Sequence, residues 1–225
     1  AMAPDAEAMA PDAAQAGPDA EAMLPDAASL PDAGVTVPLP GFGTLTGECG
    51  VLDTELTDSD PHFVVNTLDF GTDPYDASDL AKLTTGGQKI ATSPNAGGSS
   101  IMSETFAFEA LARCELASLL KIETEIIYTT PGKITDELVE IDGLKIGVSV
   151  VRAMTYPRTN PYTEALAKSI LEKKLQGILD STQNVAPEDK WKKQILHVLA
   201  DTQQHADVLR TVWDKTSATL RADTV

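Results

Sequence analysis

Several features that would assign the chain to a protein class are scarce or missing. Only 2 of the 225 residues are Cys, which excludes the disulfide-rich miniproteins. No stretch of the sequence approaches the roughly 20 consecutive apolar residues that cross a bilayer. We therefore expect a soluble protein without a transmembrane segment.

Basic residues are absent from the first third of the chain. The formal net charge is −17, but all 17 Lys and Arg lie at or after Lys82, whereas 16 of the 34 Asp and Glu precede it. The remainder of the chain is therefore close to neutral. Phosphate binding needs clustered basic side chains, and this charge distribution neither supports nor excludes a nucleic-acid partner.

Residues 1–40 repeat the tripeptide Pro-Asp-Ala. Proline interrupts helices, and a segment of Ala, Pro and Asp buries too little apolar surface to offset its chain entropy. We expect a disordered acidic linker over 1–40 and a loop-rich acidic lead-in over 41–100 with up to two short strands, in which Gly86-Gly87 and Gly97-Gly98 are loop glycines. Such a tether favours the cell envelope or secretion, although the sequence leaves the compartment open.

Residues 101–225 carry the clearest helix and strand patterns. We predict helices over 101–121, 162–182 and 201–219, and strands over 121–130 and 193–200. Asp142-Gly143 predicts a hairpin between the segments 133–141 and 144–153. This order predicts an α/β fold, a three-layer sandwich with a mixed central sheet. Residues 221–225 resemble the opening of another strand, which would make the domain truncated at its C-terminus.

The hairpin turn also predicts the register of the two strands. If Ile141 faces Leu144, then Glu140 faces Lys145 and Asp136 faces Ser149. Alternate residues point to opposite faces, so one face is apolar and the other carries Asp136, Lys145 and Ser149. We take the polar face as the candidate site.

The element order resembles the core of the PD-(D/E)XK nuclease-like fold, also called restriction-endonuclease-like. In those enzymes a helix Glu, a strand Asp, and an acidic residue with a Lys on the next strand hold a divalent metal ion and the attacking water. The resemblance implies that Glu109 is the helix carboxylate, with Glu104 as the fallback, and that Asp136 is the strand Asp. Where the family has its acidic residue and Lys, this chain has Ser149-Val150-Val151, followed by Arg152.

The same resemblance implies a metal site and a charge-stabilising group. Mg²⁺ prefers oxygen ligands in near-octahedral geometry, and Glu109, Asp136 and Ser149 are the ligands expected here. Lys145 or Arg152, or else Lys133, would replace the missing lysine. Lys145 shares the face of Asp136, whereas Arg152 is expected on the apolar side.

The chain also resembles a widespread, poorly characterised family. The shared motifs are SExFAFE, KITD, GVSVxRA and KQILHV, found here at 103–109, 133–136, 147–153 and 193–198. This likeness implies no established activity.

Ordinary structural roles compete with each of these assignments. Glu109 can pair with Arg113 one helical turn later, and Glu140 can pair with Lys145 across the hairpin. Cys114 with His197 is a conceivable nucleophilic pair, but a Cys on an apolar helix stripe is usually inert. Trp191 among Lys190, Lys192 and Lys193 is a candidate surface for stacking on nucleic-acid bases.

Two functions remain open at this stage. The first is a nuclease-like domain that performs metal-dependent phosphodiester hydrolysis or binds nucleic acid with a degenerate active site. The alternative is a catalytically inactive protein-interaction module displayed on a disordered tether. A nucleic-acid partner and a protein partner are therefore both expectations.

Overall fold

The computed structural model describes residues 37–39, 42–94 and 100–225. All of these belong to one compact unit, residues 31–225. Of the predicted linker 1–40, only Val37–Leu39 falls within the described residues; Gly97-Gly98 lie outside them. None of the helices in the described part of the chain combines the length and apolar character of a membrane span.

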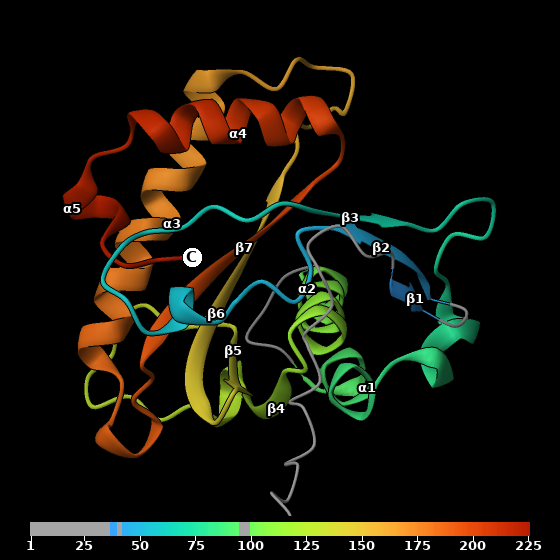
Figure 1. Ribbon diagram of the computed structural model, residues 1–225. Coiled ribbons are helices and arrows are strands. Elements are labelled where there is room, and N and C mark those ends of the chain that lie inside the picture. The colour runs from blue at the N-terminus through green and yellow to red at the C-terminus, as the bar shows by residue number, and fades with distance from the viewer. Residues whose placement is uncertain (1–36, 40–41, 95–99) are drawn as a thin grey trace, which may run out of the picture. The chain divides into compact units, whose positions relative to one another are not determined.

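A four-stranded mixed sheet forms the centre of the unit (Figure 1). Its strands, in spatial order, are β4 (Ser118–Ile122), β5 (Glu137–Ile141), β6 (Leu144–Ala153) and β7 (Lys193–Ala200). The first three are antiparallel, whereas β7 runs parallel to β6.

The predicted hairpin register is confirmed. Ile141 pairs with Leu144 and Glu140 with Lys145. The backbone φ angles of Asp142 and Gly143 are 50° and 74°, as a two-residue turn with positive φ at both positions requires. The local turn signal was therefore sufficient to place the five pairs from Glu137–Val148 to Ile141–Leu144, although β5 begins at Glu137 and not at residue 133 as predicted.

Helices cover both faces of the sheet (Figure 1). On one face, α2 (Ile101–Cys114) packs its Ala107, Phe108 and Leu111 against β5 and β6. On the other face, α3 (Glu164–Asn184) and α4 (Gln203–Lys215) pack against β6 and β7. The expected α/β fold with a mixed sheet is confirmed, and this sheet lies between two helical layers.

The region after α2 differs from the prediction. The helix ends at Cys114 rather than at residue 121, because Leu116 adopts a φ of 53° that a helix cannot continue through. The predicted strand over 121–130 is also wrong, since β4 starts at Ser118 and the 3₁₀ turn η3 (Glu123–Glu125) follows it.

The C-terminal helix is divided into two pieces. The predicted helix over 201–219 is α4 followed by the short α5 (Ala218–Arg221), whose N-cap is Ser217. A further 3₁₀ turn, η4 (Pro187–Asp189), joins α3 to β7. Residues 222–225 form no strand, but the main chain of Val225 hydrogen bonds with β7.

The lead-in contains more structure than predicted. An antiparallel sheet is formed by β1 (Val37–Leu39), β2 (Gly43–Gly47) and β3 (Asn66–Asp69). The 3₁₀ turns η1 (Thr54–Leu56) and η2 (Ala77–Lys82) precede and follow β3. A Cys49–Cys114 disulfide joins this region to α2.

The glycine pair 86–87 lies in a helix, α1 (Thr85–Thr92), and not in a loop as predicted. A Cβ atom at Gly86 would lie 2.3 Å from the Phe108 ring, and one at Gly87 would lie 2.1 Å from Oε1 of Glu109. The two glycines therefore permit the close crossing of α1 and α2.

Candidate active site

Glu109 lies in a buried contact between α1 and α2. Its Oε1 accepts hydrogen bonds from the backbone N–H and the hydroxyl of Thr84, at 2.8 and 2.6 Å. Its Oε2 accepts a bond of 2.9 Å from Nε of Arg113. Thr84 is the N-cap of α1, so Glu109 ties the start of that helix to α2. Both carboxylate oxygens are engaged in this structural role.

Asp136 directly precedes β5 and has a different set of partners. Its N–H donates to the carbonyl oxygen of Val148, and its Oδ2 accepts a bond of 2.6 Å from the N–H of Val150. The pairing of β5 with β6 ends at Glu137 and Val148, and the N–H of Asp136 bonds to that same Val148, so the expected pairing of Asp136 with Ser149 is not formed. The structure thus does not bring Glu109 and Asp136 together, and the predicted ligand set Glu109, Asp136 and Ser149 is not formed.

Glu104, the fallback helix carboxylate, is the one on which the charge of Asp136 acts. Residues 104 and 109 are separated by about 140° around a helix, so they face different neighbours. Burial raises the pKa of Glu104, and the negative charges of Asp136 and Glu123 raise it further, whereas Ser100 and Lys174 lower it. Glu104 is 4% exposed. The charge of Asp136 therefore affects the pKa of a buried carboxylate.

Lys174 supplies the cation of this site. It projects from α3, and its Nζ lies 3.9 Å from Oδ2 of Asp136 and donates a bond of 2.7 Å to the carbonyl oxygen of Val150. Burial raises the pKa of Asp136, and Lys174 opposes that rise. The sequence analysis did not identify Lys174. Its only sequence signal was a charged position next to the buried Leu175 of α3.

Glu137, the residue after Asp136, is a buried carboxylate without a hydrogen-bond partner among the described residues. It is 1% exposed, and neither carboxylate oxygen has a hydrogen-bond partner within the described residues. Burial raises the pKa of Glu137 well above its usual value, and the neighbouring charges of Asp136 and Glu104 add to this effect. An unpaired buried carboxylate is costly, so Glu137 holds a proton or needs a cation. The sequence pointed to it only as an acid on the otherwise apolar face of the hairpin.

The two predicted charge-stabilising residues, Arg152 and Lys145, have partners of their own. Arg152 points to the α2 side as predicted, where its Nε donates to the hydroxyl of Ser103, one residue before Glu104. Lys145 lies at the other end of the hairpin and donates from Nζ to the carbonyl oxygen of Glu188. Lys145 is therefore not a partner of Asp136, because the length of β5 separates them.

The contacts of Cys114 and of Trp191 rule out the two other candidate sites. Cys114 is disulfide-bonded and has no free thiol. Trp191 is 5% exposed, packs on Gly147 and donates from Nε1 to Thr182. Lys193 is also buried, and its Nζ donates a bond of 2.9 Å to Oδ1 of Asp58. The predicted basic aromatic surface around Trp191 is therefore not available for stacking.

We refer to Glu104, Asp136, Glu137 and Lys174 together as the carboxylate cluster. Within the ranges 42–94 and 100–225, no group of three or more His, Cys, Asp or Glu side chains is placed so that it could hold a metal ion. Glu137 offers two buried oxygens that have no partner among the described residues, which is the donor type that hard divalent cations prefer, and the charges of Asp136 and Glu104 act on it. Ligands from solvent or from a substrate would have to complete such a site.

In sequence, the chain is similar to a longer protein. The chain is 43% identical over 149 residues to the AAC-rich mRNA clone AAC4 protein of Dictyostelium discoideum. The match covers 64% of this chain and 22% of the relative, so the chain spans about a fifth of that protein's length. The printed name of the relative states no reaction. No protein-family model matches the chain, and no solved structure matches it.

Proposed function

We propose that this unit is a nuclease-like domain whose carboxylate cluster binds Mg²⁺ and a phosphodiester of nucleic acid. The observation that carries the proposal is Glu137. Neither of its two buried oxygens has a hydrogen-bond partner among the described residues, and the charges of Asp136 and Glu104 raise its pKa further. Strongly shifted pKa values and unsatisfied buried charges are typical of functional sites. A purely structural carboxylate is paired, as Glu109 is with Thr84 and Arg113.

The order of elements supports the same proposal. The succession α2, β4, β5, β6, α3, β7 is the α, β, β, β, α, β order of the PD-(D/E)XK fold. Asp136 directly precedes the second of these strands, and Glu104 lies on the first helix. The departure is in the third strand, where Ser149 and Val150 replace the acidic residue and the lysine. Lys174, from the following helix, offers a cation at the same end of the sheet.

In the proposed site the carboxylates would bind the metal ion and Lys174 would contact the phosphate. Carboxylate oxygens of Asp136, Glu137 and Glu104 would hold the metal ion, whose chemistry is to neutralise phosphate charge and to lower the pKa of a bound water. The bond from Val150 fixes the orientation of Asp136. Lys174 would approach a phosphate oxygen and balance the charge that develops on it.

A cleavage assay tests this proposal. The full chain is incubated with Mg²⁺ or Mn²⁺ and with single- and double-stranded DNA and RNA. We expect cleavage that falls by about 100-fold in Asp136→Asn. Glu109→Gln is the matched control, because it alters a buried carboxylate on α2 outside the cluster. Cleavage that persists in Asp136→Asn would contradict the proposal.

The competing proposal is a catalytically inactive domain that keeps this fold as a protein-interaction module. It is favoured by the loss of the acidic residue and lysine from the third strand, where Ser149-Val150-Val151 stand. Metal binding without cleavage of any substrate would support a degenerate site. If the chain neither binds the metal ion nor cleaves any substrate, the interaction module is the supported proposal.

A further inference from the structure

Thr135, the residue before Asp136, is completely buried and lies in a network of polar side chains. Its hydroxyl donates a bond of 3.1 Å to Oγ of Ser181 on α3 and accepts one of 3.1 Å from Nε2 of Gln194 on β7. Nε2 of Gln194 also donates to Oγ of Ser181, whose own hydroxyl donates to the carbonyl oxygen of Ile178. The side chain of Thr135 is therefore held by two other elements of the fold.

The main chain of Thr135 is held as well. Its N–H donates a bond of 2.7 Å to the phenolic oxygen of Tyr128. Tyr128 is itself fixed beside the end of α3, because it forms a β-bridge with Val185, the C-cap of that helix. Both the backbone and the side chain of Thr135 are thus anchored to the α3 side of the sheet.

This anchor restricts where Asp136 can lie. Asp136 precedes β5, so the pairing of that strand with β6 does not place it. Its position depends on the bond from its own N–H to Val148 and on the residue before it. Thr135 and Asp136 contact the same helix. Their partners Ser181 and Lys174 lie seven residues apart on α3, and therefore on nearly the same face, so the two contacts together fix Asp136 relative to α3.

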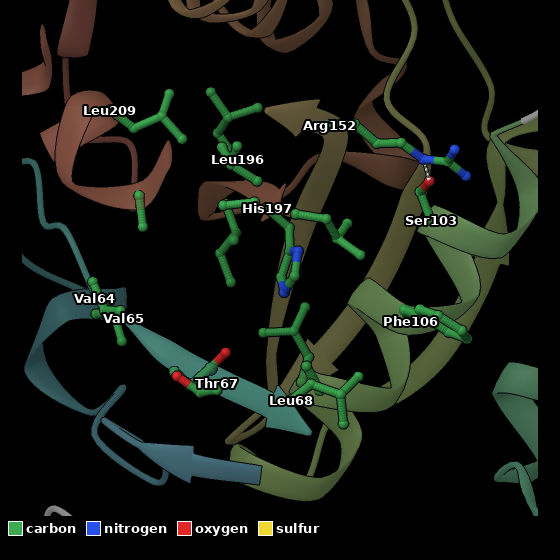
Figure 2. A pocket seen from close by; sticks show the side chains of 18 of the residues that line it. Val64, Val65, Thr67, Leu68, Ser103, Phe106, Arg152, Leu196, His197 and Leu209 are labelled. Atoms are coloured by element: carbon green, nitrogen blue, oxygen red, sulfur yellow. Dashed lines mark hydrogen bonds between the residues drawn. The ribbon is translucent and has the colours of Figure 1, made fainter. Parts of the chain in front are cut away.

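The other two carboxylates of the cluster are placed by regular secondary structure. Glu104 lies within α2, and the residue before it, Ser103, accepts a bond from Nε of Arg152 on β6 (Figure 2). Glu137 belongs to β5, whose pairing with β6 places it. Of the three carboxylates, Asp136 is the one outside a helix or strand. Its orientation therefore depends most on the anchor before it.

We propose that Thr135 is a positioning residue, which holds the carboxylate of Asp136 in place for its bond with the N–H of Val150. Groups that orient metal ligands without touching the ion contribute about 10- to 100-fold to metal affinity. The role of Thr135 in Mg²⁺ binding rests on the proposed function, whereas its effect on the bond between Asp136 and Val150 does not. This gives Thr135 of the KITD segment and Gln194 of the KQILHV segment a role that the sequence did not suggest.

The exchange rate of the Val150 amide hydrogen measures this role without any metal ion. That N–H donates to Oδ2 of Asp136 at 2.6 Å and lies beyond the last pair of β5 with β6. Hydrogen exchange followed by NMR compares the full chain with Thr135→Val, which keeps the shape of the side chain and removes its hydroxyl. We expect the Val150 amide of Thr135→Val to exchange about tenfold faster, relative to the amides of the β5–β6 pairing. Thr135→Ser keeps the hydroxyl and should restore the wild-type rate.

Two further variants separate positioning from a general loss of stability. Tyr128→Phe removes the acceptor of the Thr135 N–H and should also speed exchange at Val150. Thr216→Val is the matched control, because Thr216 is 7% exposed and its hydroxyl donates to the carbonyl oxygen of Val212 on α4. This variant loses a buried hydroxyl outside the network and should leave the relative rate at Val150 unchanged.

Isothermal titration of Mg²⁺ then tests the link to the metal site. Thr135→Val should bind Mg²⁺ about tenfold more weakly than wild type and Thr216→Val. The inference is overturned if the relative exchange rate at Val150 is unchanged in Thr135→Val, if Thr216→Val raises it equally, or if Thr135→Val binds Mg²⁺ as tightly as a wild type that does bind it. A wild type that binds no Mg²⁺ would instead contradict the proposed function, and the exchange rates would then decide the role of Thr135 on their own.

Discussion

The Nζ of Lys174 lies 3.9 Å from Oδ2 of Asp136, although Lys174 comes from α3 and Asp136 directly precedes β5. Val150 of β6 joins them, because its N–H bonds to Asp136 and its carbonyl oxygen accepts from Lys174. The main chain of Val150 therefore positions both Asp136 and Lys174. The following predictions depend on this arrangement and on the contacts around it.

Lys174→Met should raise the pKa of Asp136, because the ammonium lowers that pKa in the folded protein. It should also slow any cleavage by about 100-fold, since a cation near the reacting phosphate is lost. The pKa change is measured by NMR titration of the Asp136 carboxyl carbon. Lys168→Met is the control, because Lys168 is exposed on the same helix and pairs with Glu172 at 3.8 Å. An unchanged Asp136 titration would show that Lys174 does not act on it.

Glu137 should make the metal-free protein less stable as the pH rises. Its folded-state pKa lies well above the ordinary 4.5, so the folded state binds this proton more tightly than the unfolded state. The free energy of unfolding should therefore be highest below the unfolded pKa and fall by about 1.4 kcal/mol per pH unit until the folded pKa is passed. Urea unfolding of the wild type and of Glu137→Gln across this range measures the effect. A pH dependence that the substitution leaves unchanged would assign it to other groups.

Glu109 should contribute to stability and not to metal binding. Glu109→Ala should lower the free energy of unfolding by about 3 kcal/mol, because it leaves the buried side of Arg113 and the N–H of Thr84 without a partner. Glu172→Ala removes an exposed pair of the same helical spacing and should cost less than about 1 kcal/mol. Thermal and denaturant unfolding compare the two. Equal losses would mean that burial of Glu109 has no energetic consequence.

The Cys49–Cys114 disulfide should stabilise the link between the lead-in and α2. It closes a loop with a sequence separation of 65, for which the loss of loop entropy corresponds to about 4 kcal/mol. The double variant Cys49→Ala with Cys114→Ala should therefore unfold at lower denaturant concentration than the oxidised wild type. Reduced wild type should behave like the variant. A reductant with no effect on the unfolding midpoint would contradict this role.

The parts of the fold with strong local signals could be predicted from the sequence. Asp142-Gly143 set the hairpin register, and the apolar run of residues 193–200 matched β7. The end of α2 could not be predicted, because it depends on contacts distant in sequence. Glu115 accepts bonds from the N–H groups of Gly50 and Leu52, and the adjacent Cys114 is held by the disulfide.

The candidate site was predicted only in part for the same reason. Asp136 was identified because the hairpin register placed it on the polar face and because the resemblance expects a strand Asp there. Glu104 and Glu109 are both acids on one helix and both are buried, so the sequence did not distinguish the one that faces Asp136 from the one that faces Thr84. Lys174 was missed because its approach to Asp136 depends on how α3 crosses β6, which no local pattern specifies.

The binding of a divalent cation by the carboxylate cluster is measured most directly by isothermal titration of Mg²⁺ into the full chain at neutral pH. Wild type and Glu109→Gln should both give a saturable heat of binding. Asp136→Asn should give none, because it removes one of the carboxylates beside Glu137. The account would be contradicted by a wild type that binds no Mg²⁺, or by binding that survives in Asp136→Asn and is lost in Glu109→Gln.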